Sequence, residues 1–207
     1  MILIQKYFNN LSTEQINQFS KLESLYNYWN QKINLISRKD NSQLYLRHVL
    51  HSLSIARLIK FKINSDILDV GTGGGFPGLP LAILFPEVNF YLNDSIKKKI
   101  SIVKDISNSL NLSNINIIHS RAEVIDKKFD FIVSRAVTNM SGFMKLVKNK
   151  FHEESKHEIE NGILYLKGGD LRKELRNINH KSYPIINYFE ESFFETKQII
   201  YVSYRYL

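Results

Sequence analysis

The feature that most restricts what this chain can fold into is a cluster of glycines directly after a short apolar segment. Residues 66–70 read Asp-Ile-Leu-Asp-Val, and glycines follow at positions 71, 73, 75 and 78. A glycine backbone reaches positive φ and lets a ligand approach closely, but it loses more conformational entropy on folding than any other residue. Four glycines beside a buried strand therefore predict a turn that binds a ligand.

The chain after residue 66 alternates short apolar runs with helical stretches. This rhythm is typical of βαβ units around a parallel sheet, so the sequence predicts an α/β fold. Crossover helices are expected through residues 96–110 and 139–150. The last two strands are separated only by residues 190–197, which predicts an antiparallel pair at the sheet edge. The expected strands are 66–70, 89–93, 115–119, 129–133, 162–167, 184–189 and 199–206.

The first 60 residues are predicted to be helical. Ser12 to Gln15 form a capping box, and apolar residues then recur at spacings of three and four up to Trp29. A second helix is expected to begin near Asp40 and to carry an apolar stripe from Leu46 to Ala56. The sequence thus predicts a helical extension at 1–60 and one compact α/β unit at 61–207.

Composition excludes several kinds of chemistry. The chain has no cysteine, so it can hold no disulfide, thiolate metal site or cysteine nucleophile. Its six histidines form no convincing ligand set, and no metal is expected. The formal net charge of +8 attracts phosphates, which favours a nucleic acid as partner.

The sequence predicts neither a signal peptide nor a membrane-spanning segment. The apolar run at Met1–Ile4 is too short for a signal peptide. No stretch approaches the roughly 18 uninterrupted apolar residues of a membrane span. We therefore expect a cytoplasmic protein with no membrane association, acting as a monomer.

The glycine cluster matches the binding pattern of two cofactors, and it matches that of S-adenosylmethionine more specifically than that of a dinucleotide. The pattern D-x-G-x-G-x-G from Asp69 to Gly75, which includes Gly71 and Gly73, is associated with S-adenosylmethionine. The pattern G-x-G-x-x-G, ending at Gly78, fits a dinucleotide but is weak alone. Asp94 ends the second strand, where an acid can bind the ribose of either cofactor. A nicotinamide oxidoreductase would also need a substrate domain, for which 207 residues leave little room.

The residues after the fourth strand restrict the methyl acceptor. Transfer from a sulfonium is an in-line displacement, in which the enzyme mainly holds the reactants at near-attack distance. Carbon-5 pyrimidine methylation normally needs the missing cysteine. Exocyclic-amine enzymes usually carry an Asn/Asp-Pro-Pro-aromatic motif, whereas this chain has Ser134-Arg135-Ala136. By elimination, this favours a ring nitrogen such as guanine N7, which needs no deprotonation.

Five segments together resemble one known family, the bacterial small-subunit ribosomal RNA guanine-N7 methyltransferases, once called glucose-inhibited division protein B. The similarity runs from about Tyr26 to Lys167, and beyond Lys167 it is general. Each segment alone is a weak signal, but all of them in this order are highly specific. The segments are Trp29–Leu35, Arg47–Leu53, Asp69–Gly78, Asp94–Lys99 and Ser134–Ala136.

The resemblance implies a Rossmann-like, class I S-adenosylmethionine-dependent methyltransferase fold with an N-terminal helical extension. It implies methylation of N7 of a guanine in the 530 loop of 16S ribosomal RNA. Arg135 is expected to act catalytically beside both cofactor and base, and Asn34, Arg47 and His48 are expected to contact the substrate. The expected cofactor-binding residues are Gly71, Gly73, Gly75, Phe76, Asp94, Ala122, Glu123 and Arg135.

Two positions depart from the family pattern. His51 stands where many members carry Asp, which puts in doubt any proton-transfer role for that helix. Asn93 stands where an aliphatic residue is usual, and we expect this change barely to touch the cofactor site. A non-catalytic RNA-binding or assembly factor that retains the fold is the alternative function. The intact glycine turn, Asp94 and Arg135 argue against it.

Overall fold

A seven-stranded sheet forms the centre of the molecule in the computed structural model, which describes residues 1–36 and 42–207. The strand order is β3-β2-β1-β4-β5-β7-β6. β1 to β5 are parallel, and β7 runs antiparallel to both β5 and β6. The strands are β1 (Asp66–Val70), β2 (Asn89–Asp94), β3 (Ile115–His119), β4 (Phe131–Arg135), β5 (Gly162–Gly168), β6 (Lys181–Pro184) and β7 (Lys197–Ser203). The α/β class and the antiparallel ending are confirmed.

Three strands lie away from their expected positions. The last strand, expected at 199–206, begins two residues earlier and ends at Ser203, because Tyr204 opens a 3-10 turn. β4 begins at Phe131, two residues late, because Phe129 pairs with Phe151 in an isolated parallel bridge outside the main ladder. The sixth strand was expected at 184–189 but ends at Pro184. Ile185 opens a 3-10 turn and is fully buried. The apolar run that suggested a strand therefore fills the core instead of pairing in the sheet.

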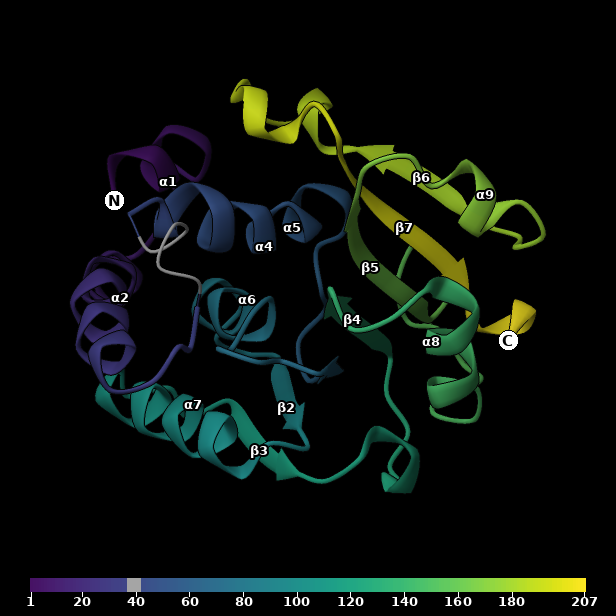
Figure 1. Cartoon of the computed structure of the whole chain (residues 1–207), viewed down its shortest axis with the longest axis horizontal. Helices are drawn as coiled ribbons and strands as arrows, with labels where there is room; N and C mark the ends of the chain where they lie inside the picture. The colour runs from purple at the N-terminus through teal and green to yellow at the C-terminus, as the bar shows by residue number, and fades with distance from the viewer. Residues whose placement is uncertain (37–41) are drawn as a thin grey trace.

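The helices cover the sheet on two sides. Figure 1 shows α6 (Gly78–Leu84) and α7 (Lys97–Ser109) on the side of the N-terminal helices. It shows α8 (Met140–Val147) near β5 and β7, and α9 (Arg172–Leu175) beside β6. Side chains alternate along each strand. Phe131 thus joins one hydrophobic cluster and Ile132 the other.

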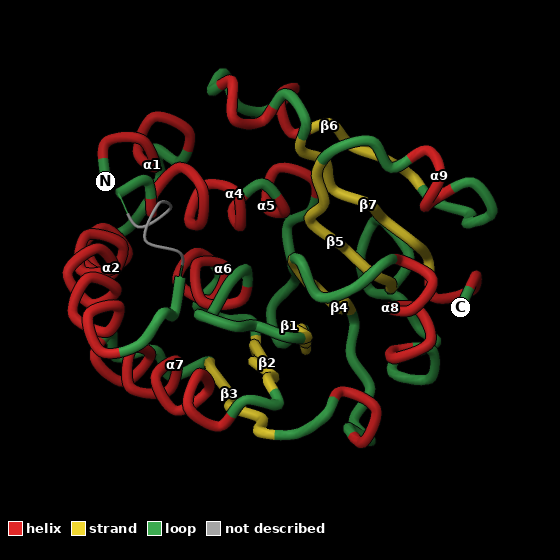
Figure 2. The backbone as a smooth tube through the Cα atoms, viewed as in Figure 1, coloured by secondary structure: helices red, strands yellow, loops and turns green. Residues whose placement is uncertain are grey.

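The N-terminal extension begins with α1 (Ile2–Tyr7) and α2 (Thr13–Lys32). The capping box at the start of α2 is confirmed, because Ser12 and Gln15 each accept the other's backbone N–H. The predicted helix start near Asp40 lies outside the described residues. Helical backbone continues through a π-helical segment at Tyr45–Leu50, α4 (His51–Leu53) and α5 (Ile55–Leu58) (Figure 2).

The extension and the sheet share one hydrophobic core. Phe19, Leu22 and Tyr26 of α2 are fully buried and belong to the same cluster as Leu79 of α6 and Leu92 of β2. The stability of the α/β unit therefore depends on residues that precede it in the sequence. No helix in the described part of the chain is both long and apolar enough to cross a membrane.

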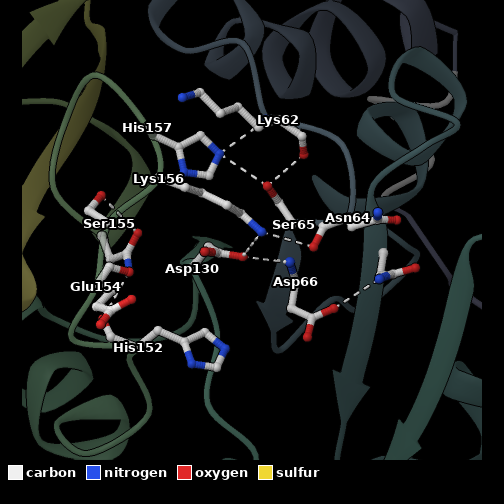
Figure 3. A network of polar contacts seen from close by, with 12 residues as sticks. Lys62, Asn64, Ser65, Asp66, Asp130, His152, Glu154, Ser155, Lys156 and His157 are labelled. Carbon is white, nitrogen blue, oxygen red and sulfur yellow. Dashed lines mark hydrogen bonds and ion pairs between the residues drawn. The ribbon is translucent and has the colours of Figure 1, made fainter.

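A polar network joins three segments at the amino ends of the strands (Figure 3). The Asp130 carboxylate accepts the backbone N–H of Asp66 at 2.8 Å and pairs with the Lys156 ammonium at 3.3 Å. Lys156 also donates to the carbonyl of Asn64 at 2.9 Å. His157 Nε2 accepts the backbone N–H of Lys62 at 3.1 Å. These bonds fasten the entries to β1, β4 and β5 and leave the carboxyl ends for the site described next.

Candidate active site

The glycine turn after β1 has left-handed backbone at three positions. φ is +66° at Gly71, +58° at Gly73 and +94° at Gly75. A Cβ on Gly71 would lie 2.5 Å from Cγ2 of Val137, so packing as well as backbone requires glycine there. A Cβ on Gly75 would lie 3.2 Å from Leu79, toward the protein interior. At Gly73 the nearest atom is 3.9 Å away, so the backbone is open to a ligand at this position.

Asp69 holds the turn in place from below. Its Oδ2 accepts the Thr72 hydroxyl at 2.6 Å and the Gly78 backbone N–H at 2.8 Å. Its Oδ1 is buried and has no hydrogen-bond partner in the part of the chain that is described. Burial raises the pKa of this carboxyl to about 7, although the bonds from Thr72 and Gly78 act in the opposite direction. The turn is thus pinned by a group that titrates near neutral pH.

Asp94, at the end of β2, lies beside the turn. Its Oδ2 accepts the Gly73 N–H at 3.0 Å, and its Oδ1 accepts the Ile96 N–H at 2.8 Å. An ionised carboxylate has about four lone-pair positions, so it can accept further hydrogen bonds, such as those of two ribose hydroxyls. The two backbone bonds fix the direction in which these remaining positions point.

A crevice of about 130 Å³ opens between the carboxyl ends of β1, β2 and β3. Four of the predicted cofactor residues line it, namely Gly71, Asp94, Ala122 and Glu123. The other lining residues are Val70, Asn93, Ser95, Ser120, Arg121, Val137 and Leu146. Ligands of open α/β sheets bind in such a crevice outside the carboxyl ends of the strands.

The expected small effect of Asn93 on the cofactor site stays a prediction, but its side chain has a defined structural role. Asn93 lines the crevice, and its amide donates to the carbonyls of Ile118 at 3.2 Å and Ser120 at 2.9 Å. An aliphatic side chain cannot make these bonds. Asn93 therefore ties the end of β2 to the loop after β3 that carries Ala122 and Glu123.

Arg135 brings a second set of predicted residues together. It is the last residue of β4, and its Nη1 donates to the carbonyl of Arg47 at 3.1 Å. Its Nη2 lies 2.7 Å from Nδ1 of His48. Because a guanidinium only donates, Nδ1 accepts, which puts the proton of a neutral His48 on Nε2. Substrate residues predicted on the extension are thus joined to the predicted catalytic residue.

Phe76 supports this cluster from inside the protein. The Arg135 guanidinium carbon lies 5.2 Å from its ring centre, and the ring of His48 lies 4.9 Å away. The ring of Tyr26 stacks on the Phe76 ring with centres 5.0 Å apart, and its hydroxyl donates to the carbonyl of Gly74. Phe76 is only 2% exposed and is not among the residues that line the crevice. Its ring contacts are with Tyr26, His48 and Arg135, and a contact of Phe76 with the cofactor stays a prediction.

Comparison with known proteins decides the family. The family model for rRNA small subunit methyltransferase G matches residues 15–199. The chain belongs to this family. Proteins named ribosomal RNA small subunit methyltransferase G from Flavobacterium johnsoniae and Flavobacterium psychrophilum are 52% and 54% identical to it over 204 residues. Each alignment covers 98% of this chain and 98% of the relative.

Solved structures share the fold at low identity. A SAM-dependent methyltransferase from Aquifex aeolicus aligns with 80% of this chain and 97% of its own, with a TM-score of 0.57 and 15% identity. Precorrin-6y C5,15-methyltransferase from Geobacter metallireducens aligns with 73% and 86%, with a TM-score of 0.53 and 10% identity. The predicted Rossmann-like methyltransferase fold is confirmed.

Asn34, predicted to contact the substrate, and His51, which departs from the family pattern, have different surroundings. Asn34 is exposed, in a segment whose next residue, Leu35, packs on the glycine turn 3.3 Å from where a Cβ on Gly74 would lie. His51 is buried, and burial, followed by the charge of Arg135, lowers its pKa well below the usual value. His51 is therefore a neutral imidazole, at the position where the resemblance led us to expect an acid.

Tyr165 of β5 was not predicted as a site residue. Its hydroxyl bonds the backbone of Val137 and Thr138, in the turn that follows Arg135. In the sequence it is one aromatic residue within an apolar strand, which is also how a core tyrosine looks. No local signal separates the two cases, because the contact joins residues 27 or 28 positions apart.

We also compared a second cavity and possible metal-binding groups with this site. A cavity of about 580 Å³, lined by residues 58–63 and 156–159, lies at the amino ends of the strands and contains none of the predicted residues. Among the residues that the structure describes, no group of three or more His, Cys, Asp and Glu side chains could hold a metal ion.

Proposed function

We propose that this protein transfers a methyl group from S-adenosylmethionine to N7 of a guanine in the 530 loop of 16S ribosomal RNA. The observation that carries the proposal is the juxtaposition of two sites at the carboxyl edge of one sheet. The open glycine turn and Asp94 form the first, and Arg135 with His48 forms the second. Relatives named as small-subunit ribosomal RNA methyltransferases support the substrate class.

The residues of the crevice fit the cofactor in kind. The Asp94 carboxylate suits the ribose, and Ala122 and Glu123 would contact the adenine. Gly73 does not line the crevice, but it leaves room for close approach on the adjoining glycine turn. A volume of about 130 Å³ is below the range of about 300–1,000 Å³ typical of ligand sites. The crevice would therefore hold only part of the cofactor, and the rest would lie over the open glycine turn at Gly73. When bound, the cofactor supplies a methyl group activated by its sulfonium.

The protein contributes orientation to the transfer. Guanine N7 attacks with its own lone pair, so no group has to remove a proton first. Arg135 can donate to guanine O6 or to a flanking phosphate, and it has no lone pair that competes for the methyl. Its bonds to the carbonyl of Arg47 and to His48 orient its planar fork before the substrate arrives. Preorganised geometry of this kind is what an in-line displacement requires.

The extension supplies the substrate contacts in this proposal. Arg47 and His48 come from the π-helical segment of the extension, and Asn34 comes from the irregular stretch after α2. The net charge of +8 favours an RNA backbone. A ribosomal substrate implies action in the cytoplasm. We further propose that the protein acts as a monomer.

The test is methylation of ribosomal RNA with isotopically labelled cofactor, followed by mass analysis of RNA fragments. We expect label on one guanine of the 530 loop, as N7-methylguanosine. Tight RNA binding without any labelled nucleoside would instead support the non-catalytic assembly factor. Label on a different nucleotide would retain the methyltransferase activity and contradict the target.

A further inference from the structure

The turn between β4 and α8 has an unfavourable backbone conformation next to the crevice. Ala136 has φ of +56°, in the left-handed region that residues with a Cβ rarely adopt. Such a conformation costs on the order of 1 kcal/mol and persists only where the surroundings hold it. The next residue, Val137, lines the crevice and is in contact with Gly71. Something must therefore hold residues 136–138 in place.

The hydroxyl of Tyr165 does this from beneath the turn. It accepts the backbone N–H groups of Val137 and Thr138 and donates to the carbonyl of Thr138, each at 2.9 Å. One donor and two acceptor positions are all that a tyrosine hydroxyl has. The side chain is fully buried, and its ring packs on Phe143 of α8 with ring centres 4.6 Å apart. β4, β5 and α8 are neighbours in Figure 1.

A charged pair reinforces the far end of the same turn. Lys167 donates to the carbonyl of Thr138 at 3.1 Å and pairs with Glu174 at 2.8 Å. Glu174 in turn accepts the backbone N–H of Met140 at 2.6 Å. The turn is therefore restrained at both ends, while its residues 136–138 are themselves exposed. Because the turn is exposed, these bonds do not serve core packing. They fix the side of the turn that faces the crevice, where Val137 lies.

We propose that the Tyr165 hydroxyl is a positioning group for methyl transfer. It holds Val137 against the glycine turn as one wall of the cofactor crevice, and it fixes the backbone directly after Arg135. The inference rests on the proposed location of the cofactor. Tyr165 itself lies in the core and touches neither reactant.

The decisive variant is Tyr165→Phe, which removes one oxygen and keeps the ring. We expect weaker S-adenosylmethionine binding by calorimetry, and a single-turnover rate at saturating cofactor and RNA that falls about tenfold or more. RNA affinity should stay unchanged. The matched control is Tyr201→Phe, because that tyrosine is also buried and its hydroxyl donates to the carbonyl of Glu160 at 2.8 Å, at the amino end of β5. The control should lose stability but keep wild-type rate and cofactor affinity.

A folded Tyr165→Phe protein with wild-type rate and cofactor affinity would overturn the proposal. If this variant does not fold, Val137→Ala serves instead, since Val137 is 38% exposed. It should weaken cofactor binding, and unchanged binding would equally overturn the proposal. The wild-type protein, measured in the same assays, distinguishes failure of the positioning role from failure of the proposed function. Absence of RNA methylation by the wild type would contradict the function, whereas the cofactor affinities still test the positioning role.

Discussion

The guanidinium of Arg135 and the imidazole of His48 lie 2.7 Å apart, between Nη2 and Nδ1, although 87 residues separate them in the chain. One belongs to the last position of β4 and the other to the π-helical segment of the extension. The contact joins the cofactor side of the site to the side predicted to bind RNA. The site is therefore built jointly by the sheet and the extension.

Replacement of Arg135 should slow the reaction without unfolding the protein. We expect Arg135→Ala to reduce the single-turnover rate on the order of a hundredfold, because the orienting contact is lost. Arg135→Lys should recover little, since an ammonium does not reproduce the planar fork. Arg172→Ala is the control, because the Arg172 side chain is 89% exposed and pairs only with Asp170 among the described residues. An alanine variant of Arg135 with the wild-type rate would make that residue a bystander.

A side chain at Gly73 should block the cofactor. A Cβ there meets no atom closer than 3.9 Å, so the branches of Gly73→Val would occupy the space left for the ligand. Gly169→Val is a matched control, since Gly169 has φ of +84° and a Cβ placed on it would meet nothing within 4 Å. Both variants bear backbone strain, but only Gly73→Val should lose S-adenosylmethionine binding in calorimetry. Equal affinities in the two variants would contradict the assignment.

The buried carboxyl of Asp69 should give stability a characteristic pH dependence. Its pKa is about 7 in the folded protein, against 3.8 ordinarily, so the folded state holds the proton more tightly. The resulting stabilisation is complete below about pH 4 and is lost as the pH rises to about 7. Urea titrations without cofactor should show the wild type losing a few kcal/mol of unfolding free energy relative to Asp69→Asn over this range. A constant difference between the two proteins would disprove the shifted pKa.

RNA binding should weaken steeply with salt. Each neutralised phosphate releases counterions, so the logarithm of the affinity falls linearly with the logarithm of salt concentration. If Arg47 contacts a phosphate, Arg47→Gln should reduce this slope by about one. Lys62→Gln, at the opposite end of the sheet, should leave the slope unchanged. Filter binding or fluorescence anisotropy over a salt series measures both, and identical slopes for all three proteins would remove Arg47 from the interface.

Much of the site could be predicted because its elements are local in sequence. Short apolar runs that alternate with stretches of helical spacing predicted the order of strands and helices. In a parallel sheet all carboxyl ends meet at one edge, so Asp94 and Arg135 had to lie near the glycine turn. Even the misplaced start of β4 did not alter this, because Arg135 ends the strand at that same edge. The predicted position of the sixth strand was wrong, because an apolar residue such as Ile185 gives the same sequence signal whether it is buried in a turn or in a sheet.

What the sequence by itself determined is the α/β order and the glycine turn, since these follow from backbone sterics and short-range periodicity. The choice of S-adenosylmethionine came from the glycine pattern and the family resemblance. Tertiary structure alone decided the pairing of Arg135 with His48, the place of Asn93 in the crevice wall and the hold of Tyr165 on the turn after β4. Each of these is a hydrogen bond between segments at least 25 residues apart. No local preference encodes such a bond, because its geometry exists only once the strands and helices have packed.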